Sequence, residues 1–267
     1  RGVQKIFHAF RIDHVLGFYR IYAFPWRPGR NPEFLPLSRE QMLEKTGGMS
    51  PQFYPRDDSS PDHCEANRQE GEHYLRAVLE ESRTSRVVGE DLGTVPNYVR
   101  PSLHSLGIAG FKIPQWENSP DGRSIPGREY QRLSVATYAT HDHKPVRALW
   151  EDAFEESRPD SAQARQDLTK IGEFAGIPGI TSELDYDREF YGPIMEALFR
   201  SESWIALVMI TDLLARKDRF NVPGTATSSN WSRRMSKTVD ELSSSRSVRK
   251  RMRQIRELLE KTGRLSS

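Results

Sequence analysis

The sequence predicts an α/β protein built on a parallel sheet, and three observations carry this prediction. Short apolar runs without strict alternation recur along the chain, as in strands that are buried on both faces of a parallel sheet. Segments with helical periodicity separate these runs, which is the pattern of βαβ units. The chain has 267 residues, and α/β barrels often span about 250 residues, so one large domain is feasible.

Five runs are expected to be strands, because each is short and rich in apolar or β-branched residues. In chain order they are Ile6–Ile12, Arg86–Gly89, Ile108–Ile113, Val135–Ala139 and Ile205–Ile210.

Helices are expected between these runs. Gln69–Ser85 carries an apolar stripe at the i, i+3, i+4 spacing of an amphipathic helix. Pro96–Leu106 begins with a proline in its first turn and is followed by Gly107, a residue suited to ending a helix. Further helices are expected over Pro145–Glu156, Ser161–Ala175 and Arg188–Arg200.

Residues 25–67 interrupt this alternation. The segment is rich in Pro, Gly and Asp and is long for a plain connection between a strand and a helix. We therefore expect residues 25–67 to be a loop insertion beside the active site of a domain that covers residues 1–235.

Residues 236–267 are expected to hold a charged C-terminal helix. Six basic residues between Arg246 and Arg256 allow a nucleic-acid patch. A solvated helix face is the alternative, because Val248, Met252, Ile255 and Leu259 form an apolar stripe and Glu257 dilutes the charge.

Composition excludes several classes of protein. The formal net charge is only +2, so no global field favours nucleic acid or a membrane surface. The longest apolar run, Trp204 to Ile210, is far too short to span a bilayer. The single cysteine, Cys64, cannot form an internal disulfide, which fits a reducing compartment, and we expect a cytoplasmic protein.

Three carboxylate motifs follow expected strands. Asp13 lies in Arg11-Ile12-Asp13-His14, Glu90 lies in Gly89-Glu90-Asp91-Leu92-Gly93, and Asp142 ends Thr140-His141-Asp142. On a barrel, the carboxyl ends of different strands bring such groups together. Cleavage of a glycosidic bond with retention needs one carboxylate nucleophile and one carboxylic acid that donates a proton.

The neighbours of these carboxylates suggest roles. Arg11 lies two residues before Asp13, so both side chains point to one face of a strand and the guanidinium favours an ionised nucleophile. Glu90 follows the apolar Val87-Val88-Gly89, where burial would keep an acid protonated. His141 is placed to hydrogen-bond sugar hydroxyls beside Asp142.

These motifs resemble the 4-α-glucanotransferase family (amylomaltase, or disproportionating enzyme) of the α-amylase superfamily. The resemblance covers about residues 6–235 and rests on the three motifs, with Gly17-Phe18 after the first and Val95-Pro96 after the second. It continues through Arg219-Phe220-Asn221-Val222-Pro223-Gly224-Thr225 to Asn230-Trp231.

The resemblance implies a (β/α)8 TIM barrel that moves α-1,4-glucan segments between maltodextrin acceptors and needs no cofactor and no metal. It makes Asp13 the nucleophile, Glu90 the general acid/base and Asp142 the stabiliser of the transition state. Arg11 and His141 would support them, and Asn221 would contact sugar.

The resemblance also implies that Asp13 ends the fourth strand of the barrel, Glu90 the fifth and Asp142 the seventh. Only strands four to eight are then expected in these residues, as the C-terminal part of a longer enzyme. With the N-terminal half of the barrel missing, the chain by itself is expected to be inactive. The family often continues its third motif as His-Asp-Asn-Asp, whereas His143-Lys144-Pro145 follows Asp142 here.

Other interpretations remain open at this stage. A hydrolase of the same superfamily and a non-catalytic carbohydrate-binding protein both accommodate these motifs. A metal-dependent hydrolase would use His8, His14, His141 and His143 as ligands. Trp26, Tyr54 and Trp116 are candidates either for stacking on glucose rings or for ordinary packing.

Overall fold

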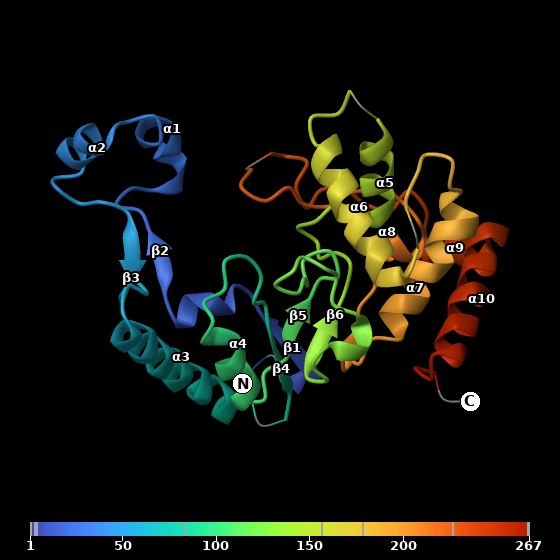
Figure 1. Ribbon diagram of the computed structural model, residues 1–267, viewed down its shortest axis with the longest axis horizontal. Helices are drawn as coiled ribbons and strands as arrows, with labels where there is room; N and C mark the ends of the chain where they lie inside the picture. The colour runs from blue at the N-terminus through green and yellow to red at the C-terminus, as the bar shows by residue number, and fades with distance from the viewer. Residues whose placement is uncertain are drawn as a thin grey trace. The chain divides into compact units, whose positions relative to one another are not determined.

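The computed structural model describes residues 2, 5–82, 84–155, 157–177, 179–225 and 227–265. The chain divides into two compact units, Arg1–Gly110 and Phe111–Ser267 (Figure 1). Strands and helices alternate along both units, so the expected α/β class is confirmed.

A parallel strand pair organises the first unit. Strand β1 (Ala9–Ile12) pairs in parallel with β4 (Arg86–Gly89), with Ile12 opposite Gly89. Val88 of β4 also forms a parallel bridge with Ala109. The expected strand over Ile6–Ile12 was too long: Ile6 and Phe7 are exposed and precede β1, because β4 begins at Arg86 and offers no further partner.

Helix α3 (Pro61–Glu81) is longer at its start than the predicted Gln69–Ser85. It begins at Pro61 because the Ser60 side chain accepts a hydrogen bond from the His63 N–H and Pro61 occupies the first turn. Helix α4 (Val99–Ser105) packs against it and lies within the predicted Pro96–Leu106. Gly107 follows α4 with a φ of 74°, so it supplies the expected helix stop.

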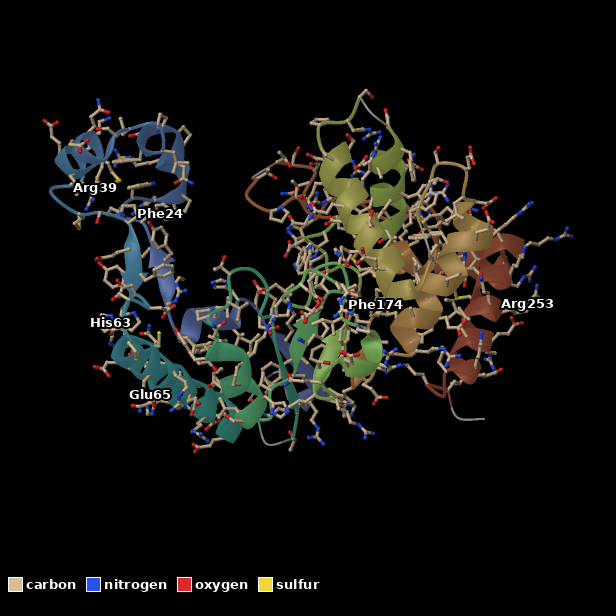
Figure 2. The ribbon with its side chains drawn as sticks, in the orientation of Figure 1. Phe24, Arg39, His63, Glu65, Phe174 and Arg253 are labelled. Carbon is tan, nitrogen blue, oxygen red and sulfur yellow. The ribbon has the colours of Figure 1, made fainter. Side chains whose placement is uncertain are left out.

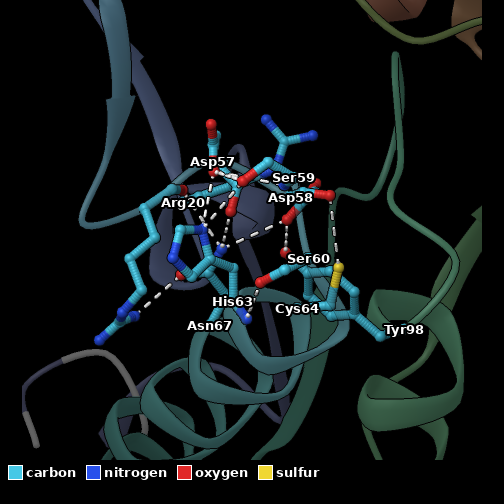
Figure 3. Close-up of polar contacts among 10 residues, drawn as sticks. Arg20, Asp57, Asp58, Ser59, Ser60, His63, Cys64, Asn67 and Tyr98 are labelled. Atoms are coloured by element: carbon cyan, nitrogen blue, oxygen red, sulfur yellow. Dashed lines mark hydrogen bonds and ion pairs between the residues drawn. The ribbon is translucent and has the colours of Figure 1, made fainter.

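A polar network joins the start of α3 to its surroundings (Figure 3). Asp57 accepts hydrogen bonds from the Ser59 hydroxyl and pairs with His63, which lowers the pKa of Asp57 to about 2. Asp58 pairs with Arg20 at 2.6 Å and accepts a hydrogen bond from Tyr98 Oη at 2.9 Å. These contacts tie the residues before α3 to segments far away in sequence.

The segment 25–67 contains more regular structure than a loop. Strands β2 (Ile21–Ala23) and β3 (Gln52–Tyr54) form an antiparallel hairpin that carries α1 (Asn31–Phe34) and α2 (Arg39–Lys45) at its tip (Figure 1). Phe24, labelled in Figure 2, packs its ring between those of Tyr22 and Trp26. The segment's last residues, from Pro61 on, belong to α3.

The second unit holds a three-stranded sheet in the order β5-β6-β7. Strands β5 (Gly110–Lys112) and β7 (Ile205–Ala206) lie within the predicted runs but are shorter. Strand β6 (Ser134–Ala136) begins one residue before the predicted Val135–Ala139 and ends three residues before it does. Pairing of β6 with β7 is parallel, with Val135 opposite Ile205. The predicted strand over Ile205–Ile210 was wrong at its end, because Ile210 begins helix α8 (Ile210–Leu213).

Helices supply most of the second unit's core. α5 (Val146–Phe154) packs on α6 (Ser161–Ala175), and α6 packs on α7 (Tyr191–Phe199). A π-helical turn, Tyr186–Phe190, leads into α7, so this helical region starts just before the predicted Arg188. Leu168, Ile194 and Leu198 are fully or almost fully buried in this core, and Phe174, labelled in Figure 2, packs against it.

The charged C-terminal segment forms two helices, α9 (Val239–Ser244) and α10 (Arg246–Lys261). Ile255 of α10 is buried in the core of the second unit, and Arg251 stacks on the Tyr191 ring at 3.7 Å. Arg253, labelled in Figure 2, is exposed. The apolar stripe of α10 thus packs against the core while charged side chains face outward. This arrangement supports the interpretation of the segment as a helix with a solvated charged face. Among the described residues, no helix has the length and hydropathy to cross a membrane.

Candidate functional site

Asp13 and Glu90 are brought to the same sheet edge by the register of β1 and β4. Ile12 lies opposite Gly89, so each carboxylate follows the last paired residue of its strand. Hydrogen bonds continue past the strands, because the Glu90 N–H donates to Ile12 O at 2.9 Å and the Val15 N–H donates to Glu90 O at 3.0 Å. The backbone around both carboxylates is therefore tied together.

Arg11 lies between these two carboxylates. Its Nη2 atom is 2.7 Å from Asp13 Oδ1 and 3.9 Å from Glu90 Oε2. The ion pair with Asp13 agrees with the prediction that the two side chains share a face. Asp13 remains 75% exposed at its side chain, whereas Glu90 is only 12% exposed. An accessible carboxylate beside a guanidinium is chemically suited to nucleophilic attack.

Glu90 has polar partners where an apolar environment was expected. Its Oε2 atom accepts the His14 N–H at 2.8 Å, and its Oε1 atom accepts the Leu92 N–H at 3.1 Å. One of these N–H groups lies just after β1 and the other just after β4, so both strand ends contribute a hydrogen bond to the carboxyl. Both oxygens of Glu90 thus have a defined position.

Asp91, the residue after Glu90, is buried inside the first unit and holds the turn that follows β4. It is 2% exposed and forms an ion pair with Arg100 at 3.1 Å. A Cβ atom on Gly110 would lie only 2.7 Å from Asp91 Oδ2, so a glycine is needed where the chain passes this carboxylate. The sequence motif marks Asp91 but does not reveal that Gly110 makes room for it.

His141, Asp142 and Asn221 come together in the second unit. His141 Nε2 is 3.2 Å from Asp142 Oδ2, and Asn221 Nδ2 donates to Asp142 Oδ1 at 2.6 Å. Each carboxylate oxygen of Asp142 therefore has one side-chain partner. Asn221 was predicted to contact sugar, and in this structure its amide nitrogen donates to Asp142, a geometry that supports holding this carboxylate.

Arg219 is a site residue that sequence reasoning did not single out. Its Nη2 atom donates to Asp142 O at 2.6 Å, and its Nε atom donates to Asn221 O at 2.7 Å. One guanidinium thus links the backbones of two residues that are also linked through their side chains. The signal was present in the sequence, because Arg219 begins the motif that contains Asn221.

The residues after Asp142, where the motif departs from the common family sequence, have partners within the second unit. His143 Nδ1 accepts the Thr140 N–H at 3.1 Å, which closes the turn that carries Asp142. Lys144 pairs with Asp152 at 2.7 Å and with Asp160 at 2.8 Å. These two residues serve the local fold of the second unit.

Two of the other candidates from the sequence, Trp26 and Trp116, have ring partners. The Trp26 ring stacks on Phe34 at 4.5 Å, and its Nε1 atom donates to Asn31. Trp116 lies edge-on to His143 at 4.8 Å and is 45% exposed, while Tyr54 on β3 is 50% exposed. Across the part of the chain that the structure describes, no cluster of three or more His, Cys, Asp or Glu side chains could hold a metal ion, the four histidines of the metal interpretation included.

Asp212 is a buried carboxyl that no motif indicated. It is 2% exposed on α8, and its Oδ1 atom accepts the Val146 N–H at the start of α5, at 2.7 Å. Burial raises the pKa of Asp212 to about 7. The group precedes the loop that carries Arg219 and Asn221.

Comparison with known proteins places these motifs in a family. The sequence profile described as 4-alpha-glucanotransferase matches residues 1–240. The 4-alpha-glucanotransferase of Chlamydia caviae is 28% identical over 254 residues, which cover 91% of this chain and 40% of the relative. That of Chlamydia pneumoniae is 26% identical over 257 residues, with the same coverage.

Solved structures agree at the level of the fold. Amylomaltase from Streptococcus agalactiae, solved in complex with acarbose, has a TM-score of 0.61 and 18% identity, covering 97% of this chain and 42% of that one. Amylomaltase from Corynebacterium glutamicum has a TM-score of 0.60 and 22% identity, covering 86% and 32%.

This chain spans about 40% of the length of the curated relatives that it matches. The profile match nevertheless extends over most of the 267 residues and includes all three carboxylate motifs. The chain belongs to the 4-alpha-glucanotransferase family.

Proposed function

We propose that the protein is a 4-alpha-glucanotransferase that moves α-1,4-glucan segments between oligosaccharide acceptors. Its residues 1–235 would form strands four to eight of a catalytic (β/α)8 barrel, with residues 25–67 as an insertion. Family membership and the partial match to amylomaltases support this proposal. The acarbose bound to the Streptococcus agalactiae enzyme supports an α-glucan oligosaccharide as substrate.

The observation that carries the proposed chemistry is the placement of Arg11 against two carboxylates at adjacent strand ends. Asp13 attacks the anomeric carbon and forms a covalent glycosyl ester, while Glu90 gives its proton to the leaving oxygen. Glu90 then takes a proton from the acceptor hydroxyl, which displaces Asp13 and restores the configuration. Asp142 stabilises the positive charge that develops on the sugar ring.

Substitution of the proposed acid/base tests whether the protein is an enzyme. Glu90→Gln in the full-length protein should lower maltotriose disproportionation by orders of magnitude, because the amide cannot transfer the proton. A carbohydrate-binding protein would show no such activity to lose and would bind maltooligosaccharides unchanged. Chromatography of the products distinguishes a transferase, which makes a ladder of longer glucans, from a hydrolase, which only shortens them.

Trapping the glycosyl ester tests the role of Asp13. A fluorinated glycosyl fluoride slows the second step, so the ester accumulates and can be located by mass spectrometry. Trypsin cleaves after Arg11 and Arg20, which isolates Asp13 in the peptide from Ile12 to Arg20. The added mass is expected on this peptide and should be absent from an Asp13→Asn variant. Label on any other peptide would contradict the assignment.

A further inference from the structure

Trp231 combines an exposed ring with a backbone conformation that large side chains avoid. Its φ is 60°, in the left-handed region that favours glycine, and the residue is 64% exposed. A bulky residue persists in this conformation only when its surroundings hold it there. Packing in the described part of the chain does not account for the ring, since most of its surface faces solvent.

The loop before Trp231 is closed by hydrogen bonds. The Asn230 side chain accepts the Val222 N–H at 3.1 Å and donates to Thr225 O at 2.9 Å. The Trp231 N–H then donates to Phe220 O at 2.8 Å. These hydrogen bonds fix the backbone position from which the Trp231 side chain extends.

The indole lies beside the Asp142 carboxylate group. Its ring centroid is 5.0 Å from that of His141, and His141 Nε2 is 3.2 Å from Asp142 Oδ2. Trp231 and Asn221 therefore lie in one loop, and this loop contacts His141 and Asp142. An exposed aromatic ring next to a polar cluster provides an apolar surface with hydrogen-bonding groups at its edge.

We propose that Trp231 is a stacking platform for a glucosyl unit of the α-1,4-glucan next to the unit at Asp142. A glucose ring presents C–H groups on its face and hydroxyls around its rim, which suits an indole flanked by an imidazole and a carboxylate. The inference rests on the proposed function and assigns a specific binding role to a residue outside the three catalytic motifs. The strained backbone is retained because it turns the ring toward the sugar.

Binding to the inactive Glu90→Gln form of the full-length protein tests this role without turnover. Calorimetric titration with maltoheptaose measures Kd, and quenching of tryptophan fluorescence reports contact with the indole. Trp231→Ala and Trp231→Gly are expected to weaken Kd roughly 5- to 20-fold, as for other ring-stacking contacts. Trp231→Phe keeps an aromatic face and should stay within about 3-fold of the parent Kd.

The Trp231→Gly variant distinguishes the contribution of the indole ring to sugar binding from the effect of the strained backbone on stability. Glycine suits a φ of 60°, so Trp231→Gly should keep or raise the Tm while it loses affinity. Trp204, which is 43% exposed in the same unit, is the matched control, and Trp204→Ala should leave Kd within about 2-fold. The quench on sugar binding should disappear in Trp231→Phe and persist in Trp204→Ala.

Two results would overturn the inference. Unchanged Kd values in both Trp231→Gly and Trp231→Ala would show that the indole does not stack on the sugar. A fall in Tm in the same variants would indicate that the ring packs against another protein segment instead. Absence of any maltoheptaose binding by the Glu90→Gln parent would overturn the proposed function together with this role.

Discussion

The Asn221 side-chain amide donates a 2.6 Å hydrogen bond to Asp142, a residue 79 positions earlier in the chain. His141 contacts the other oxygen of the same carboxylate, so the group cannot rotate without losing a partner. A carboxylate that stabilises developing charge must be held in place before the reaction begins. The Asn221–Asp142 contact provides that preorganisation from a distant loop.

Removal of this contact should slow the chemical step. Asn221→Ala in the full-length protein is expected to lower kcat about 10- to 100-fold, because a hydrogen bond to a charged group contributes about 1.5–3 kcal/mol. KM should change little if the amide only positions Asp142. Steady-state disproportionation kinetics measure both constants, with Asn118→Ala, an exposed residue of the same unit, as control. A large rise in KM at constant kcat would instead indicate direct sugar contact by Asn221.

Arg219 should act through Asn221 and Asp142 and not independently. Lysine cannot reproduce the fork that reaches both Asp142 O and Asn221 O, so Arg219→Lys should lose most of the activity that Arg219→Ala loses. The double variant with Asn221→Ala should cost less than the sum of the two single losses in activation free energy. Additive losses would contradict a shared task. Thermal unfolding of each variant shows whether folding is affected.

Asp212 should make the stability of the protein depend on pH. Burial raises the pKa of this carboxyl from its ordinary value near 3.8 to about 7, so the folded state binds the proton more tightly than the unfolded state. Its contribution therefore makes the free energy of unfolding fall as pH rises from about 4 to about 7, by at most about 1.4 kcal/mol per pH unit. Below about pH 4 and above about pH 7 this contribution is flat.

Asp212→Asn should remove that slope while keeping an acceptor for the Val146 N–H. The free energy of unfolding of the variant relative to the parent should then rise between pH 4 and 7, as measured by urea denaturation. Asp212→Ala should also lose the slope. It should be less stable than Asp212→Asn at every pH, because the Val146 N–H is left without its acceptor. A parent and an asparagine variant with parallel pH profiles would show that Asp212 does not titrate in this range.

Two helical glycines should respond in opposite ways to alanine. Alanine favours a helix by about 1 kcal/mol over glycine. At Gly71 of α3, however, the new Cβ would lie 2.3 Å from the fully buried Tyr19 ring, so Gly71→Ala should destabilise by about 1–3 kcal/mol overall. Gly192 of α7 faces only the flexible end of Gln254 at 3.1 Å, and Gly192→Ala should be neutral or slightly stabilising. Urea denaturation of the two variants decides this, and equal effects would contradict the steric argument.

Local signals in the sequence were sufficient for the alternation of strands and helices. The apolar runs that become β1, β4 and β6 are short and flanked by loop residues, and the stripe of α3 is visible in its periodicity. The ends of the elements are not marked by local signals, because they depend on partners elsewhere in the chain. β1 starts at Ala9 only because β4 starts at Arg86, and α3 starts at Pro61 through a cap that its apolar stripe does not mark.

By itself, the sequence determined the family and the order of the three carboxylate motifs, since both depend on residue types at short spacings. Only the tertiary structure showed that Arg11 contacts both Asp13 and Glu90, that backbone N–H groups surround Glu90, and that Asn221 holds Asp142. Partners of this kind are separated by tens of residues. Hydrogen bonds form only over about 3 Å, so their choice is decided by how the chain packs and not by any local pattern.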